Sequence, residues 1–227
     1  MFTALPASNK QQIMAQIRLF KSLPARELVE IERIATLGNV TKGHTFYHPE
    51  TTSELVYILL EGRVHQYRIN LDGKKIVTAM LQPHAFFDAA SLLEDGVHHN
   101  FAETMQDSLV LALHHQEFRR LLLTYPHLLM YMLTETNARL TEVEEKLESV
   151  AFRGIMGRIA ELLLKLAAQQ GGNCVVGYTH QEIAESIGTY RETTTQVLNE
   201  LRALGCIAIG RRHIDILNAG KLAAALH

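Results

Sequence analysis

The chain has 227 residues, of which 47% are hydrophobic and 20% are charged, and its formal net charge is −2. This composition is ordinary for a globular protein of one or two domains, and it excludes a globally basic nucleic-acid-binding protein and a chain dominated by membrane spans. The first residues show neither a basic region nor a continuous apolar run, and the cysteines, Cys174 and Cys206, are far apart. We therefore expect a cytoplasmic protein with reduced cysteines, no signal peptide and no membrane contact.

The first third of the chain changes from helical to strand periodicity. Residues 8 to 37 have the pattern of two helices that are separated at Ser22-Leu23-Pro24, where Ser22 is a candidate N-cap. From Gly38 onward, short apolar or alternating runs are separated by turn signals such as Glu61-Gly62. The expected strands cover residues 45–47, 54–60, 63–69, 75–81 and 108–113, and a short helix follows at 117–124. This spacing predicts a β-sandwich or jelly roll.

A heptad pattern begins after Tyr125-Pro126 and continues to about Val150. Apolar residues recur at alternating steps of four and three among charged neighbours, which predicts one long helix with an apolar seam, and Pro126 suits its first turn. The seam is too narrow to anchor a core alone. We expect it to pair with a second copy of the chain; the alternative is a helix packed on its own chain. The expected dimer interface consists of Leu129, Leu133, Thr136, Leu140, Val143, Leu147 and Val150.

Beyond Val150 the pattern is helical again. An amphipathic helix from Ile155 to Leu166 ends near Gly171-Gly172, and residues 174–176 suit a short strand. Two segments then match the capping-box pattern, with Thr at the N-cap and Glu three residues later, at 179–182 and 189–192. Gly188 lies between them, where a tight turn needs positive φ. This arrangement predicts a helix–turn–helix.

The predicted helix–turn–helix has a small core and a polar outer face. We expect the core to contain Ile183, Ala184, Ile187, Val197 and Leu201, and the second helix to bury Thr194, Val197, Leu201 and Leu204. A hairpin of residues 207–209 and 214–217 forms a wing with Gly210-Arg211-Arg212 at its tip. The alternative is an ordinary helical hairpin with a solvated face, but polar side chains and a basic wing suit base edges and phosphates. The candidate DNA-binding residues are Thr179, His180, Gln181, Tyr190, Arg191, Glu192, Thr195, Gln196, Asn199, Arg211 and Arg212.

Three segments carry a family resemblance: residues 53–64 (SELVYILLEGRV), 157–160 (GRIA) and 179–194, which includes THQEIA and RETT. Through them the chain resembles the CRP/FNR family of bacterial transcription regulators over essentially its whole length. The resemblance implies an α+β protein with a cyclic-nucleotide-binding-like β-roll sensor domain (1–126), a dimerisation helix and hinge (127–151) and a winged helix–turn–helix domain (152–227). It also implies three partners: double-stranded DNA, a second copy of the chain and RNA polymerase.

The same resemblance implies how the second helix reads DNA. In CRP-like members, the residues matching Arg191 and Glu192 read guanine and the cytosine amino group of a TGTGA-type half-site. Arginine suits guanine O6 and N7, and glutamate accepts from cytosine N4. Where those relatives have a second arginine, this chain has Gln196, which pairs more naturally with adenine. We therefore expect a related palindrome that differs or is relaxed at one base pair.

The implied effector site departs from the pattern of cyclic-AMP-binding members. In those members a Gly-Glu pair and a later Arg-Ser pair hold the nucleotide; ungapped matching puts Asp88-Ala89 and His99-Asn100 there. Val143-Glu144 takes the place of a Thr-Ser pair that contacts adenine. A histidine is largely neutral at pH 7, and the two acidic side chains would repel a phosphate. We therefore expect that the effector pocket, at Asp88, Ala89, His99, Asn100, Val143 and Glu144, does not take cyclic AMP.

Histidines are concentrated in the expected sensor half, at positions 44, 48, 65, 84, 98, 99, 114 and 115. Because histidine ligates metal and haem iron, one alternative is a haem- or metal-dependent gas or redox sensor of the same fold. Another is a cupin-like metalloenzyme with His44 and His48 as ligands. On a continuous strand those residues lie about 13 Å apart, too far for one ion. We expect a regulator and not an enzyme; the sequence leaves the effector, any haem or metal, and the sign of regulation open.

Overall fold

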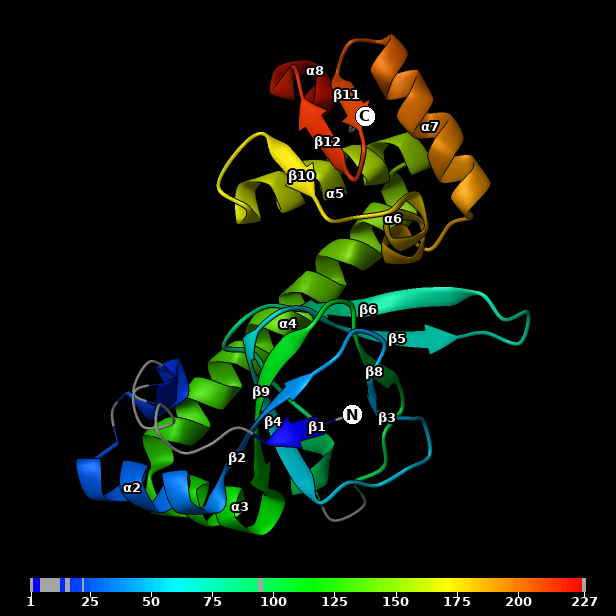
Figure 1. Ribbon diagram of the computed structural model, residues 1–227. Coiled ribbons are helices and arrows are strands. Elements are labelled where there is room, and N and C mark those ends of the chain that lie inside the picture. The colour runs from blue at the N-terminus through cyan, green and yellow to red at the C-terminus, as the bar shows by residue number, and fades with distance from the viewer. Residues whose placement is uncertain (1, 5–12, 15–16, 22, 94–95, 226–227) are drawn as a thin grey trace. The chain divides into compact units, whose positions relative to one another are not determined.

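The computed structural model describes residues 2–4, 13–14, 17–21, 23–93 and 96–225. Its contacts divide the chain into two compact units, Met1–Arg68 with Thr78–Arg139, and Ile69–Val77 with Leu140–His227. The predicted α+β class is confirmed: Figure 1 shows most strands in the first unit, and α5 to α8 with a small sheet in the second. Within the described ranges, no helix is both long enough and apolar enough to span a bilayer.

Two antiparallel sheets form the first unit. The predicted sandwich strands are confirmed, and β1, β2, β7 and β8 were not predicted. One sheet has the order β1 (Phe2–Ala4), β2 (Thr36–Val40), β9 (Ser108–His114), β4 (Leu55–Glu61) and β7 (Phe86–Phe87). The other has the order β3 (Thr45–Tyr47), β8 (Phe101–Thr104), β5 (Val64–Ile69) and β6 (Lys75–Leu81). The predicted helical region to residue 37 extends too far, because the backbone is extended from Ala35 onward.

The central strand β4 contributes to two cores. Val56, Ile58 and Leu60 belong to a cluster shared with the helices, whereas Tyr57 and Leu59 belong to a cluster with residues of both sheets. A strand buried on both faces has a continuous apolar sequence, as in residues 55–60. The turn after β4 requires glycine: Gly62 has φ +98°, and a Cβ there would lie 2.2 Å from Oγ of Ser108.

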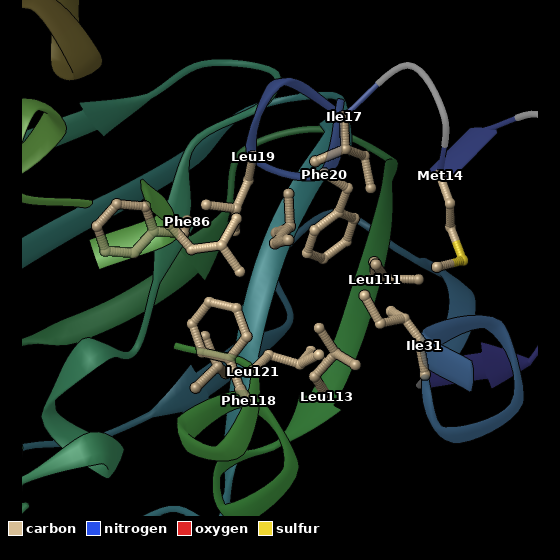
Figure 2. Close-up of a cluster of buried hydrophobic side chains, with 14 of the residues drawn as sticks. Met14, Ile17, Leu19, Phe20, Ile31, Phe86, Leu111, Leu113, Phe118 and Leu121 are labelled. Carbon is tan, nitrogen blue, oxygen red and sulfur yellow. The ribbon is translucent and has the colours of Figure 1, made fainter. Parts of the chain in front are cut away.

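Helices cover the outer face of the first sheet. They are η2 (Arg18–Phe20), α2 (Ala25–Ile34) and α3 (His115–Thr124), and η3 (Ala89–Leu92) follows β7. Figure 2 shows Phe118 and Leu121 of α3 in one buried cluster with Leu111 and Leu113 of β9. The predicted helices at 28–34 and 117–124 are confirmed. The predicted N-cap Ser22 and most of the first predicted helix lie outside the described residues.

The long helix α4 runs from Pro126 to Phe152 and is continuous, as predicted. Pro126 occupies its first turn, where the missing N–H costs no hydrogen bond. All seven seam residues are exposed, from Leu129 at 44% to Leu147 at 69%. The seam therefore does not pack on its own chain within the described residues.

The second unit contains small helices and a three-stranded sheet. Its elements are α5 (Ile155–Gln169), β10 (Cys174–Val176), α6 (His180–Ile187), α7 (Arg191–Ala203), β11 (Ile207–Gly210), β12 (His213–Ile216) and α8 (Ala219–Ala224). The sheet has the order β10-β12-β11, and both pairs are antiparallel. All of these elements except α8 were predicted.

Candidate functional site

The helix α6 begins with the predicted capping box. The backbone N–H of Glu182 donates to Oγ1 of Thr179 (3.2 Å), and the Glu182 carboxylate accepts from the Thr179 backbone N–H (2.7 Å). These reciprocal bonds satisfy two N–H groups that a helix start leaves unpaired. Gly188 ends α6 in the left-handed conformation with φ 73°, as the turn requires.

The second predicted capping box is wrong. The helix α7 begins at Arg191, and its N-cap is Tyr190, whose side chain accepts no capping hydrogen bond. The pattern at 189–192 places threonine one residue too early, because the turn after Gly188 is longer than the pattern assumes. Thr189 is instead buried, and its backbone N–H donates to the carbonyl of Ala184 (2.9 Å).

The helix–turn–helix core is largely as predicted. Ile183, Ala184 and Ile187 of α6 are buried, as are Thr194, Val197 and Leu201 of α7. The prediction that Leu204 is buried is wrong, because Leu204 is the C-cap, beyond the last helical turn, and is 56% exposed. Leu198 is buried in its place. Arg158 of α5 donates to the carbonyl of Ile187 (3.0 Å) and so fixes the end of α6.

The outer face of α7 is exposed and polar. Arg191, Glu192, Gln196 and Asn199 are exposed, and Thr195 is half-buried. Of the candidate residues on and before α6, Thr179 and Gln181 are exposed, His180 is half-buried, and Tyr190 is 61% exposed. A hydrogen bond joins the two helices at this face: Nδ1 of His180 lies 2.9 Å from Oγ1 of Thr195.

The predicted wing is present as the β11–β12 hairpin. Gly210 pairs with His213 across the hairpin, so Arg211 and Arg212 form its tip, and both are exposed. Arg212 adopts positive φ (61°), and its carbonyl accepts from the backbone N–H of Gly177 (3.1 Å). The second unit thus carries two exposed surfaces for a polyanion: the start of α7 and this cationic tip.

In the first unit, the candidate effector site centres on Asp88. This residue follows β7, adopts the left-handed conformation (φ 66°) and is only 3% exposed. Nε2 of His98 lies 3.4 Å from Oδ1 of Asp88, and the His98 ring stacks on Tyr47 with centroids 4.0 Å apart. Among the described residues, neither carboxylate oxygen of Asp88 accepts a hydrogen bond of normal geometry.

Burial sets the electrostatics of this site. It raises the pKa of Asp88 to about 6, and the nearby Ser53 hydroxyl and Ser91 amide offset only part of the rise. Burial also lowers the pKa of His98, and the neighbouring His99 lowers it further. Tyr57 has its pKa raised to about 12 by burial and then by the charge of Asp88. The site therefore holds a carboxyl group that is costly to ionise.

Gln66 and Arg139 contact two neighbours of this site, Tyr47 and Phe86. Gln66 donates to the hydroxyl of Tyr47 (2.6 Å). The pKa of Tyr47 is raised by burial, with smaller effects from Asp88 and Arg139. Arg139 comes from α4; its guanidinium lies 4.8 Å from the Phe86 ring centroid and donates to the Phe86 carbonyl. The long helix thus brings a cation to the strand that precedes Asp88.

The structure brings only some of the predicted pocket residues together. Ala89, which follows Asp88, and Asn100, which precedes β8, are half-buried, whereas His99 is exposed and its neighbour His98 is buried. Val143 and Glu144 are exposed on α4 in the second unit, so their place in the pocket stays a prediction. Sequence reasoning missed Tyr47, His98 and Arg139. A consecutive histidine pair signals the place but not which ring is buried.

The histidines were also candidates for metal or haem binding. In the part of the chain that the structure describes, no three His, Cys, Asp or Glu side chains are grouped closely enough to hold a metal ion. His44 and His48 flank the short strand β3, and each packs edge-on against a phenylalanine, Phe46 and Phe101 respectively. Both cysteines are free thiols, and Cys206 is buried.

Two protein-family models match the chain. The model described as a cyclic nucleotide-binding domain matches residues 37–125, and the model described as a Crp-like helix-turn-helix domain matches residues 157–225. The Global nitrogen regulator of Nostoc sp. (strain PCC 7120 / SAG 25.82 / UTEX 2576) is 32% identical over 185 residues, which cover 77% of this chain and 82% of that protein. The Cyclic AMP receptor protein of Thermus thermophilus is 28% identical over 181 residues, which cover 80% and 83%.

A solved structure has the same fold. FixK2 from Bradyrhizobium japonicum superposes with a TM-score of 0.75 at 21% identity, over 85% of this chain and 97% of that one. This likeness concerns the fold alone, because the identity is low. Together with the relatives, it accounts for both halves of the chain in a single architecture.

Proposed function

Because the chain belongs to the CRP/FNR family of DNA-binding transcription regulators, we propose that it acts in the cytoplasm as a homodimer, reads a palindromic DNA site and responds to an effector other than cyclic AMP. The observation that carries the proposal is the exposed polar face of α7 on a fully packed helix–turn–helix core. The family consists of transcription regulators rather than enzymes, so the metalloenzyme alternative does not apply.

The proposed dimer is supported by the α4 seam. Six of its seven residues are apolar side chains that are 44–69% exposed, and they follow one another along a single helix. A heptad seam of this kind is buried by knobs-into-holes packing against a second helix. We place the dimerisation helix and hinge at residues 127–151, with the sensor domain before it and the DNA-binding domain after it. A two-fold dimer presents two copies of α7 to half-sites one helical turn apart.

The proposed sequence readout uses the first two turns of α7. Arg191 and Glu192 are exposed there, and they suit guanine and cytosine respectively. Gln196 is exposed one turn later, with its amide nitrogen 3.1 Å from Oε1 of Glu200. That bond uses one of the two amide N–H groups and leaves the Gln196 amide oxygen, which can accept from the adenine amino group. Arg211 and Arg212 add phosphate contacts from the wing.

The proposed difference from cyclic-AMP-binding relatives rests on Asp88. Here an anionic cyclic phosphate would lie next to a buried carboxylate. The residue after Asp88 is a half-buried alanine, and the matched cation position holds an exposed histidine, so no cation compensates the phosphate charge. Arg139 approaches from α4, but it is engaged with the carbonyl and ring of Phe86. These features favour an effector without a phosphate at this position.

A binding selection on randomised duplex DNA tests the proposed function. We expect a symmetric motif with half-sites one helical turn apart, related to TGTGA but altered at one base pair. In a parallel selection, Gln196→Arg should shift the preference at the altered base pair toward guanine. A selection without a symmetric motif, or a Gln196→Arg motif identical to the parent motif, contradicts the assignment.

A further inference from the structure

The hydrogen bond between His180 and Thr195 lies beside the proposed reading face. His180 is the first residue of α6, and Thr195 lies on α7. Residues three and four apart share a helix face, so Thr195 shares its face with Arg191, Glu192 and Asn199. Both partners of the bond are half-buried, which places the bond at the edge of the exposed surface. His180 of α6 therefore holds a side chain of the α7 reading face, that of Thr195, by a hydrogen bond.

The bond determines what the Thr195 hydroxyl does. A threonine hydroxyl within a helix commonly bonds back to the carbonyl four residues earlier. Thr124 and Thr134 of this chain do so, at 2.8 Å to Arg120 and 2.9 Å to Met130. Thr195 differs: among the described residues, the one hydrogen-bond partner of its hydroxyl is Nδ1 of His180. The hydroxyl thus points toward α6 instead of along α7.

His180 is suited to keep this bond as a neutral ring. Burial lowers the pKa of His180, and the charge of Arg191 lowers it further. A neutral imidazole has one donor and one acceptor nitrogen, so Nδ1 can accept the hydroxyl proton of Thr195 or donate to its oxygen. In either tautomer the bond directs the Thr195 hydroxyl toward His180, and it occupies either the hydroxyl proton or one of the oxygen lone pairs.

We propose that His180 is a positioning residue for sequence reading: it takes up the Thr195 hydroxyl and leaves the Thr195 methyl group to contact the C5-methyl group of a thymine. Hydroxyl and methyl diverge from the same Cβ, so a hydroxyl directed at α6 turns the methyl away from α6. A free threonine hydroxyl pairs with several bases, whereas a methyl group selects thymine. This inference rests on the proposed reading role of α7.

Two substitutions at one position separate the methyl from the hydroxyl. Thr195→Val keeps the shape and a methyl group but lacks the hydroxyl, and Thr195→Ser keeps the hydroxyl but lacks the methyl. We expect selections on randomised duplex to give a thymine preference at one base pair per half-site for the wild type and for Thr195→Val. That preference, roughly tenfold as for a single base pair, should be lost in Thr195→Ser. A loss in Thr195→Val, or its retention in Thr195→Ser, overturns the proposal.

The role of His180 is tested by a loss and a rescue. His180→Ala frees the Thr195 hydroxyl and should relax the thymine preference, whereas His180→Asn, whose amide reaches a similar position to Nδ1, should retain it. Thermal unfolding of both variants checks that the domain still folds. Full preference in His180→Ala, or equal loss in both variants, contradicts a positioning role.

The two levels of the proposal fail in different ways. A wild-type selection without any symmetric motif refutes the proposed function itself. A clear wild-type motif whose thymine preference is retained in Thr195→Ser, or is unchanged in His180→Ala, refutes only the positioning role.

Discussion

Two buried carboxylates show how the two units of this protein differ. Glu182 in the helix–turn–helix is 7% exposed, and its carboxylate accepts hydrogen bonds from the backbone N–H and the hydroxyl of Thr179. Asp88 in the β-roll is 3% exposed, and among the described residues no normal hydrogen bond reaches its carboxylate. The first group stabilises its fold, whereas the second costs free energy. The buried carboxylate of the DNA-binding unit is thus satisfied within its own helix start, whereas that of the sensor unit has His98 as its neighbour but no normal hydrogen bond.

The largest expected effect lies on α4, the helix shared by both units. Leu140→Glu should place an uncompensated charge in the proposed dimer seam and cost about 3–5 kcal/mol of association free energy. Sedimentation should then show a monomer with weakened DNA binding. Ala138→Glu adds the same charge to an exposed position outside the seam, and it should leave the dimer intact. A dimeric Leu140→Glu protein with normal DNA binding would rule out this seam.

The next effect compares how the two carboxylates change the free energy of unfolding. The folded-state pKa of Asp88 is raised, from 3.8 to about 6, so its contribution to stability is present at low pH and lost as pH rises through this window. Asp88→Asn should therefore increase the free energy of unfolding at pH 8, on the order of 2 kcal/mol, with little change at pH 4. Glu182→Gln should instead decrease it at pH 8. Denaturant unfolding at both pH values measures this, and a destabilised Asp88→Asn protein at pH 8 would make Asp88 a structural residue.

A third effect concerns affinity rather than stability. Arg191→Ala should cost about 1–3 kcal/mol on the preferred DNA site and reduce discrimination at its base pair, because base contacts carry sequence information. Arg211→Ala in the wing should weaken all sequences alike and lower the salt slope by about one. Titrations of specific and scrambled duplexes at several salt concentrations distinguish the two. Equal losses of discrimination in both variants would contradict the division between reading helix and wing.

The smallest effect tests how much the capping box of α6 contributes to stability. Thr179→Ala removes the N-cap hydroxyl and should lower stability by about 1 kcal/mol, observed as a lower unfolding midpoint. Thr193→Ala removes a half-buried threonine from the first turn of α7, where the N-cap is Tyr190, and serves as the control. If both substitutions had the same effect, the capping box would contribute nothing specific.

The parts that could be predicted from sequence are those defined by local spacing. The heptads predicted α4, and Thr179, Glu182 and Gly188 predicted the helix–turn–helix, because capping and turn geometry depend on residues three or four apart. The second capping box failed because the same four-residue pattern occurs one residue before the helix starts. The strand β2 was missed because Gly38 and Asn39 weaken its apolar pattern, and β8 was missed because only Phe101 and Ala102 of its four residues are apolar.

The position of the sensor site could be predicted from sequence, but the residues that surround Asp88 could not. Matching to the family pointed to Asp88, yet its neighbours Tyr47, His98 and Arg139 come from separate elements, and pairing across a fold leaves no local pattern. His98 and His99 are chemically identical in sequence, and only the path of the loop before β8 decides which one is buried.

The contrast between a conventional DNA-binding unit and a divergent sensor unit is tested most directly with cyclic AMP. The measurement is the affinity for the selected palindrome, together with the thermal unfolding midpoint, with and without millimolar cyclic AMP. A ligand at a hundredfold excess over its dissociation constant adds about 2.7 kcal/mol, which is a midpoint shift of several degrees for a protein of this size. We predict that the nucleotide changes neither the DNA affinity nor the unfolding midpoint. A shift of several degrees, or a rise in DNA affinity, would contradict the account of the Asp88 site.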